Sequence, residues 1–232
     1  LIMSKLAIIP ARGGSKRIPR KNIKYFLGKP IIAYAIENAI NSQLFDEIMV
    51  STDDEVIAEI AISYGAKVPF KRSEKNSSDS ATTIDVIKEV IFSYEKLGRQ
   101  FEYASCIYPC TPLLSKEKLK ESFYLLKKNN LDCVFPIIKY GFPIQRAVRL
   151  NDKGLIEMFQ PEHLITRSQD LENSFHDAGQ FYSFNVNNLV SKQKLITELT
   201  GHIEVSEMEA QDIDSLVDWQ LAELKYKIIN KY

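Results

Sequence analysis

Hydrophobic positions in the first part of this 232-residue chain follow two periods in turn. Short apolar runs such as Leu6–Pro10 are typical of buried strands. Apolar residues spaced three and four apart, as in Pro30–Asn41, are typical of one face of a helix. The predicted strands are Leu6–Pro10, Glu47–Thr52, Lys67–Phe70, Tyr103–Tyr108 and Asp132–Ile138, and the predicted helices are Pro30–Asn41, Glu55–Tyr64, Thr82–Leu97 and Lys116–Asn129.

This alternation predicts an α/β protein with a Rossmann-like, mainly parallel sheet and helices on both of its faces. In sheets of this kind, ligands bind beyond the carboxyl ends of the strands. Loops that directly follow a strand are therefore the first candidates for a functional site. One of them, Ser51–Asp53, is also expected to supply the N-cap of the next helix.

The pattern changes after Ile138. Residues 139–178 are polar, contain Gly and Pro, and show no long helical period, so we interpret them as an arm inserted into a single domain of residues 1–232. Strand-like alternation returns at Gln180–Val186, and Ser215–Tyr232 is predicted to be an amphipathic helix. The apolar face of that helix is expected to carry Val217, Leu221, Leu224 and Ile228.

Charge and composition exclude several classes of partner. The 30 Lys and Arg residues balance 30 Asp and Glu residues, so the chain has no overall field that would favour nucleic acid or an anionic membrane. No apolar run approaches the ~20 residues of a membrane span. The N-terminus shows no signal-peptide pattern, and the three cysteines lack metal-ligand spacing. A cytoplasmic protein with reduced thiols is expected.

The loop after the first strand, Ala11–Asn22, concentrates five cations within ten residues. Its two adjacent glycines allow backbone N–H groups to approach a ligand, and together with the cations they predict an anion cradle. A triphosphate suits it, since its oxygens need several donors at once. The loop is neither a Walker A loop nor a GxGxxG turn. A solvated basic loop is the alternative, which its position after a buried strand disfavours.

The same loop resembles the signature of the CMP-sugar-acid synthetases, the cytidylyltransferases that act on sialic acid, Kdo and related sugars. The resemblance covers nearly the whole chain, and the stretch Pro161–Tyr182 most resembles members that act on pseudaminic acid. The matching segments include Ile8–Asn22, Ser51–Asp53, Pro109–Pro112, Phe135-Pro136, Phe142–Arg146, Glu157–Phe159, Pro161–His163, Thr166–Asp170, His176–Tyr182 and Gln211–Asp214.

The resemblance implies a nucleotidyltransferase fold, similar to that of GT-A glycosyltransferases, and transfer of CMP from CTP to the anomeric hydroxyl of a nonulosonic acid. Pseudaminic acid is the expected sugar, with legionaminic or sialic acid as alternatives. Two other classes stay open: a metal-dependent glycosyltransferase, whose Asp-x-Asp motif would follow a mid-chain strand, and a nucleotide-binding protein without catalytic activity.

The resemblance also implies which residues handle CTP, with Arg12 and Lys21 acting in catalysis. For Arg72 the residues alone leave open a surface ion pair with Glu74, and for Thr82 a helix N-cap. The implied CTP-binding residues are Ala11, Arg12, Gly13, Gly14, Ser15, Lys16, Asn22, Arg72, Thr82 and Thr83.

Two carboxylates near the C-terminus, Asp212 and Asp214, are the candidate catalytic metal ligands. Alternate residues of an extended segment point to the same side, and paired carboxylates with substrate phosphates suit Mg²⁺. The resemblance assigns the metal to this pair, and Asp214 is expected to be its principal ligand. The alternative for Asp214 is the N-cap of the last helix.

The resemblance further implies that the arm forms a homodimer and carries sugar contacts, partly across subunits. A nonulosonic acid has a carboxylate, so arginines are expected among these contacts. Tyr108 stands where the sialic acid enzymes have Gln, and the acidic residue of the Kdo enzymes is missing, which argues against Kdo. For each candidate, a solvated or interface residue is the alternative. The candidates are Tyr108, Gln145, Arg146, Arg167, His176, Asp177 and Gln180.

Overall fold

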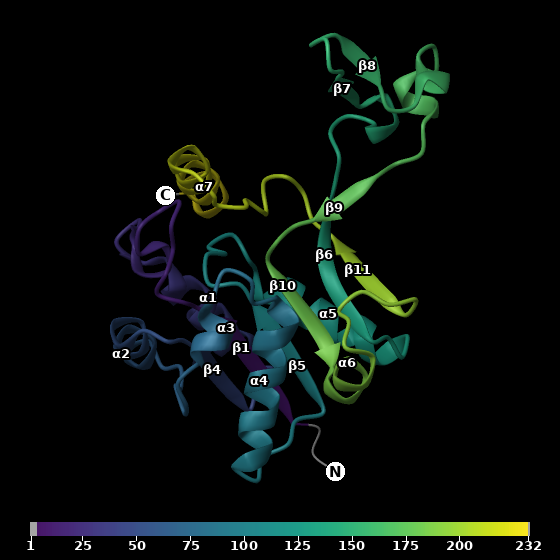
Figure 1. Ribbon diagram of the computed structural model, residues 1–232. Coiled ribbons are helices and arrows are strands. Elements are labelled where there is room, and N and C mark those ends of the chain that lie inside the picture. The colour runs from purple at the N-terminus through teal and green to yellow at the C-terminus, as the bar shows by residue number, and fades with distance from the viewer. Residues whose placement is uncertain (1–3, 232) are drawn as a thin grey trace.

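A seven-stranded sheet forms the centre of the protein in the computed structural model, which describes residues 4–231 (Figure 1). The strand order is β11-β6-β10-β5-β1-β4, and β9 pairs with β6. The strands are β1 (Lys5–Pro10), β4 (Glu47–Ser51), β5 (Tyr103–Ile107), β6 (Cys133–Lys139), β9 (Phe175–Asp177), β10 (Phe181–Asn185) and β11 (Thr200–Glu204), with the short pairs β2 (Tyr25–Phe26) and β3 (Lys29–Pro30), and β7 (Val148–Leu150) and β8 (Ile156–Met158), outside the sheet.

Helices cover both faces of this sheet, because successive strand residues point to opposite faces and are apolar on both. On one face, Ala7 and Ile9 of β1 pack with α1, α2 and α5. On the other face, Leu6 and Ile8 pack with α4 and α6. The helices are α1 (Ile31–Ser42), α2 (Glu55–Ser63), α3 (Glu74–Ser77), α4 (Thr83–Lys96), α5 (Lys116–Lys128), α6 (Val186–Lys192) and α7 (Leu216–Asn230), with 3-10 turns η1 (Lys21–Ile23), η2 (Ile144–Arg146), η3 (Pro161–His163) and η4 (Ser168–Asp170).

The predicted α/β architecture is confirmed, with a mixed and mainly parallel sheet. β1 pairs in parallel with β4 and β5, and β6 with β11. β10 lies antiparallel between β5 and β6, and β9 is antiparallel to β6. β9 and β10 run antiparallel to β6 because the chain leaves the sheet at the carboxyl end of β6, passes through the arm and re-enters the sheet at that same end.

Most predicted elements are present within one or two residues of their expected bounds, but two local predictions were wrong and several short elements were not predicted. Lys67–Phe70 is not a strand and forms only a single bridge between Lys67 and Met49. The periodicity also missed short elements, which are α3, α6, β2, β3, β7, β8, β9 and β11. The N-cap of α2 is Asp54, whose side chain accepts from the Ile57 amide, and not a residue of Ser51–Asp53.

The last helix, α7, buries a different face from the one predicted. Ser215 caps it in a capping box with Asp218, while Trp219 and Ala222 face the core. The expected core face is instead exposed, and it comprises Val217, Leu221, Leu224 and Ile228. Tyr232, the end of the predicted span, lies outside the described residues. The helical spacing of apolar residues identified the helix but did not identify which of its faces would pack against the rest of the protein.

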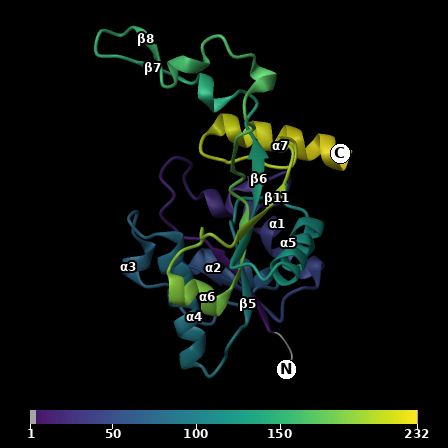
Figure 2. The ribbon, with the colours of Figure 1, turned by 90° about the vertical axis from the view of Figure 1, so that its right-hand side faces the viewer.

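The inserted segment projects beyond the body of the molecule, at the end where α7 also lies (Figures 1 and 2). It contains the β7–β8 hairpin and three 3-10 turns, and it rejoins the sheet through β9. No residue from 139 to 177 is buried. Across the described residues, no helix is long and apolar enough to cross a membrane.

Candidate active site

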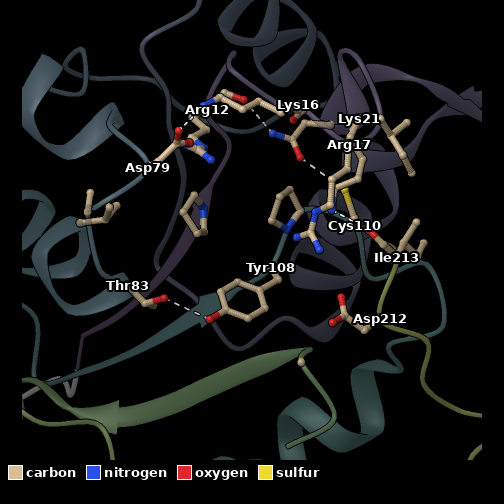
Figure 3. A pocket seen from close by; sticks show the side chains of 18 of the residues that line it. Arg12, Lys16, Arg17, Lys21, Asp79, Thr83, Tyr108, Cys110, Asp212 and Ile213 are labelled. Atoms are coloured by element: carbon tan, nitrogen blue, oxygen red, sulfur yellow. Dashed lines mark hydrogen bonds and ion pairs between the residues drawn. The ribbon is translucent and has the colours of Figure 1, made fainter. Parts of the chain in front are cut away.

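A pocket of about 530 Å³ opens beyond the carboxyl ends of β1 and β5 (Figure 3). The loop after β1 forms one wall, and the segment before α7 adjoins the exit of this loop, where Lys21 Nζ donates to the Ile213 carbonyl. Ten of the predicted site residues line it: Arg12, Ser15, Lys16, Lys21, Asn22, Arg72, Thr82, Thr83, Tyr108 and Asp212. The topology thus brings together residues that are up to 200 positions apart in the sequence.

Three residues predicted to contact CTP do not line the pocket, and two of them support the loop from behind. Ala11 is fully buried, and its amide donates to the Ser51 carbonyl. The Gly13 amide donates to Asp53 Oδ1 at 3.0 Å, and a Cβ at this position would lie 2.7 Å from Asp54 Oδ2. Gly13 is therefore required for its close approach to α2, and its amide is already bonded within the protein. Gly14 lies outside the pocket lining in open space.

The loop is fixed to the start of α2 by a second contact that sequence reasoning missed. Arg20 donates to both carboxylate oxygens of Asp54, at 2.6 and 3.2 Å. Arg20 has a φ of 56°, in the left-handed region. Together with the Gly13 contact, this bidentate pair holds the cradle at both ends, so that its other cations face the pocket.

Arg12 and Lys16, two of the cations that line the pocket, share one carboxylate. Arg12 pairs with Asp79 at 2.7 Å, and Lys16 Nζ bonds to the other Asp79 oxygen. Hydrogen bonds from Lys16 and then Arg12 lower the pKa of Asp79 below its ordinary value. Asp79 also lines the pocket and was not predicted. In this chain, Asp79 is the anionic group that Arg12 and Lys16 hold.

Arg72 is a buried pocket residue, so the surface ion pair with Glu74 that the residues left open is not formed. It is 6% exposed. Its Nε donates to Ser51 Oγ at 3.0 Å, and a terminal nitrogen donates to the Ser51 carbonyl. Burial lowers the pKa of Arg72, and its guanidinium stays charged at neutral pH because arginine is so strongly basic. It adds a fixed positive charge to the pocket.

Thr82 and Thr83 both line the pocket, but their side chains make different contacts. Thr82 is the N-cap of α4 in a capping box with Asp85, as its alternative interpretation stated. The Thr83 hydroxyl lies 3.1 Å from the Tyr108 hydroxyl at the pocket floor (Figure 3). Burial raises the pKa of Tyr108, so the phenol remains a neutral hydrogen-bonding group.

Lys21 and Asn22 tie the loop exit to the rest of the pocket. Lys21 Nζ donates to the Ile213 carbonyl at 2.7 Å and lies 3.8 Å from Asp214 Oδ1. Asn22 Nδ2 donates to the Arg12 carbonyl at 2.9 Å, and Cys110 Sγ donates to Asn22 Oδ1 at 3.3 Å. Burial raises the pKa of the Cys110 thiol to about 12, so it stays protonated and able to donate.

The two carboxylates Asp212 and Asp214 flank Ile213, which is buried in the core beside Trp219. Asp212 lines the pocket (Figure 3). Asp214 does not, and its carboxylate pairs with Arg17 and Lys21. Partial burial, followed by repulsion from Asp214, raises the pKa of Asp212. The geometry thus favours Asp212 as the principal ligand, the reverse of the expected ranking. Ser215 caps α7, so the N-cap role for Asp214 is excluded.

This pair suits a hard divalent cation. Two carboxylate oxygen donors lie close enough for one to raise the pKa of the other, and a cation between them would relieve that repulsion. Within residues 4–231, no group of three or more His, Cys, Asp or Glu side chains is arranged to hold a metal by itself. The remaining ligands would come from substrate phosphates and water, as is usual for Mg²⁺.

The predicted sugar residues, apart from Tyr108, do not line the pocket. Three lie in the arm and bond within it: Gln145 to the Glu172 carbonyl, Arg146 to Ser168, and Arg167 to Asp170. The other three lie on or beside strands β9 and β10, as His176, Asp177 and Gln180.

These three residues near β9 and β10 are engaged in structural contacts. His176 packs on the Tyr140 ring. Asp177 accepts from the Gly179 amide at 2.7 Å and from the Tyr182 hydroxyl, which fixes the turn that brings Gly179 to the pocket rim. Gln180 is 3% exposed and donates to the Glu209 carbonyl at 2.7 Å. Within a single chain, Gln180 is therefore a buried structural residue that does not line the pocket.

The chain belongs to the cytidylyltransferase family, because the family model described as Cytidylyltransferase matches residues 6–229. It is a nucleotidyltransferase. It is 41% identical over 227 residues to the pseudaminic acid cytidylyltransferase of Campylobacter jejuni, covering 97% of both chains. It is 29% identical over 226 residues to the CMP-N,N'-diacetyllegionaminic acid synthase of Legionella pneumophila, covering 95% of each.

The fold has solved counterparts. A structure of CMP:2-keto-3-deoxy-manno-octonic acid synthetase complexed with CTP superimposes with a TM-score of 0.70 over 99% of this chain and 100% of that one. Its sequence identity is 16%, so this likeness concerns the fold alone. The fold of this chain is thus shared with a protein of low sequence identity.

Proposed function

We propose that this protein transfers CMP from CTP to the anomeric hydroxyl of a nonulosonic acid and releases pyrophosphate. The observation that carries the proposal is the pocket itself, in which cations from one loop face the Asp212 carboxylate across a single cavity. Such a pocket suits a polyphosphate bound on one side by fixed cations and on the other through a metal.

The reaction is a substitution at phosphorus. The sugar hydroxyl oxygen forms a bond to the α-phosphorus of CTP, the bond from that phosphorus to the bridging oxygen of the pyrophosphate breaks, and the hydroxyl proton is lost. Arg12, Lys16 and Lys21 are proposed to bind the triphosphate and to stabilise the charge of the leaving pyrophosphate. Arg72 adds its charge from the pocket wall.

Asp212 and Asp214 are proposed to hold Mg²⁺. When bound, the ion would polarise a phosphate oxygen and lower the pKa of the attacking hydroxyl. The protein then needs to orient its substrates and to keep cations close to the phosphates, without forming a covalent intermediate. Asn22, Ser15 and the Thr83–Tyr108 pair are proposed to orient the nucleotide inside the pocket.

Pseudaminic acid is the proposed sugar, supported by identity of 41–42% to two pseudaminic acid cytidylyltransferases along 97% of the chain. Legionaminic acid is the second candidate, favoured by the relative from Legionella pneumophila. The sugar is proposed to approach from the side of Tyr108 and Gly179, both of which line the pocket away from the basic loop.

We further propose a homodimer formed through the arm, residues 139–178. No residue of 139–177 is buried, and a hairpin of two strands has little stability unless it packs on something. A second copy would supply this packing, and the arm's Gln145, Arg146 and Arg167 would gain a partner surface. The large apolar side chains exposed along the arm are Tyr140, Phe142, Ile144, Val148, Leu150, Leu155, Ile156, Phe159, Leu164, Ile165 and Phe175.

Pyrophosphate release tests the chemistry. Purified protein with Mg²⁺ is given each of the four NTPs, alone and with pseudaminic, legionaminic or sialic acid. Release is expected with CTP and pseudaminic acid together, and formation of the CMP-sugar is followed by mass spectrometry. Absence of release with CTP and every sugar would contradict CMP transfer, whereas release with legionaminic acid alone would change only the sugar.

A further inference from the structure

The segment that carries Asp212 lacks the support that usually fixes a catalytic residue. It lies between β11 and α7 and belongs to neither. Within the described chain, none of the backbone-to-backbone hydrogen bonds involves residues 210–213. Catalysis that depends on positioning loses rate steeply when a group shifts by about 1 Å, so something else must hold this segment.

Side chains supply that support, each donating to a different backbone carbonyl. Gln180 from β10's edge donates to Glu209 O at 2.7 Å, Lys225 from α7 to Ala210 O at 2.9 Å, and Lys21 to Ile213 O at 2.7 Å. The fourth carbonyl, of Asp212 itself, accepts from Gln211 Nε2 at 3.0 Å. Four carbonyls between residues 209 and 213 therefore depend on side-chain donors.

Lys225 has a second bond that connects it to Asp212. Its ammonium also donates to Gln211 Oε1 at 2.8 Å. An ammonium can only donate, so this contact fixes the amide of Gln211 with its oxygen toward Lys225 and its NH₂ toward the Asp212 carbonyl. Gln211 lines the pocket, whereas Lys225 does not. Lys225 thus acts on the pocket only through Gln211 and Ala210.

We infer that Lys225 is a positioning residue for Asp212, acting through Gln211 and the Ala210 carbonyl. The inference rests on the proposed function, because it assumes that Asp212 binds the metal of the transfer reaction. Burial lowers the pKa of Lys225, and in both of its contacts the Lys225 nitrogen is the donor. Its position on α7 couples the exposed last helix to the active site.

Lys225→Met tests this, because it keeps most of the side chain's apolar length and removes the donors. We expect kcat to fall about tenfold or more, and the Mg²⁺ concentration for half-maximal rate to rise about tenfold. The KM for CTP at saturating Mg²⁺ should stay within about twofold, because the cradle is untouched. Lys225→Arg, which retains donors, should recover much of the loss. Lys227→Met, an exposed lysine on the same helix, is the matched control.

A second measurement is independent of turnover. Mn²⁺ binding in the presence of α,β-methylene-CTP, followed by electron paramagnetic resonance, should weaken about tenfold in Lys225→Met and remain unchanged in Lys227→Met. If Lys225→Met does not fold, Gln211→Leu carries the same test, because it removes the bond to the Asp212 carbonyl and leaves Lys225 bonded to Ala210.

The outcomes separate this inference from the proposed function. Wild-type protein that releases no pyrophosphate would contradict the function. Active wild type together with Lys225→Met variants of unchanged kcat and Mn²⁺ affinity would overturn the positioning role alone. Losses in Lys225→Met that Lys225→Arg fails to recover, with equal losses in Lys227→Met, would overturn it as well, since they would indicate a general effect on α7.

Discussion

The pocket and the arm differ in how far their side chains find partners within the chain. Around the pocket, charged groups bond within the chain: Arg20 with Asp54, Arg12 with Asp79, and Lys21 with the Ile213 carbonyl. In the arm, no residue of 139–177 is buried, and side chains such as Phe142 and Ile165 are about nine-tenths exposed. The pocket is built from one chain, while the arm has the composition of a contact surface.

This difference supports the proposed division of roles, in which the pocket binds the nucleotide and the arm forms the contact with a second copy. A large exposed apolar surface is costly in water, at roughly 25 cal/mol per Å², and usually marks an interface. The pocket's nucleotide side needs no such help, because its cations are positioned by Asp53, Asp54 and Asn22. We therefore expect nucleotide handling to respond to substitutions in the pocket, and assembly to respond to substitutions in the arm.

The largest effect is expected from Asp212→Asn. Removing the carboxylate that faces the pocket should lower kcat by about 10²–10³-fold. Asp214→Asn should cost less, because that carboxylate is already paired with Arg17 and Lys21. Pyrophosphate release at saturating CTP and Mg²⁺ measures both. A larger loss in the Asp214 variant would restore the ranking expected from the sequence.

The same substitution has an opposite effect on stability. The pKa of Asp212 is raised in the folded state, so the folded protein binds this proton more tightly than the unfolded chain does. The contribution of Asp212 to the stability of the metal-free protein should therefore fall as pH rises through this raised pKa, and the stability of Asp212→Asn relative to wild type should rise over that range. Thermal unfolding without metal, at pH 4 to 8, measures the difference. A variant less stable than wild type at pH 7 would contradict it.

Ile156→Asp should break the arm's proposed assembly without touching the pocket. Ile156 lies on β8 and is 74% exposed, and a buried unpaired carboxylate at an interface is strongly unfavourable. We expect the dimer dissociation constant to rise about 100-fold or more, seen by light scattering as a change from twice the 26.6 kDa chain mass to that mass. Leu97→Asp, exposed at the end of α4, is the control. Wild type of single-chain mass would contradict the dimer.

Arg12→Ala should weaken CTP binding and leave assembly unchanged. Loss of one charge-assisted contact to phosphate is expected to raise the KM for CTP about tenfold or more. Steady-state kinetics at varied CTP and fixed sugar measure it. Arg149→Ala in the arm, whose partner is the exposed Glu157, should leave this KM unchanged. An unaltered KM in Arg12→Ala would mean that the loop charge does not reach the nucleotide.

The smallest effect is expected from Asp79→Asn. Its carboxylate competes with phosphate for Arg12 and Lys16, so its removal should lower the KM for CTP about threefold, a modest change because exposed ion pairs contribute little. Inhibition by pyrophosphate should strengthen to a similar extent. A higher KM would instead indicate that Asp79 orients the two cations for the nucleotide.

The sequence by itself determined the elements and the basic loop. Periods of two and 3.6 depend on neighbours close in the chain, so most of the longer strands and helices of the first 140 residues could be predicted within a residue or two. Caps such as Thr82 and Ser215 follow the same local chemistry. The family resemblance, carried by contiguous motifs, added CTP and the paired carboxylates, which charge and spacing alone do not identify.

Only the tertiary structure decided which groups meet. Gly13 was predicted to face the ligand but approaches Asp54. For Arg72 the residues alone left open a surface ion pair with Glu74, but its side chain is buried against Ser51 at the pocket. Lys225 bonds to Gln211 across 14 residues and a change of direction. Such contacts depend on the packing of separate elements, which no local period records. The same reason explains why α7 buries Trp219 while the apolar stripe predicted for its core face stays exposed.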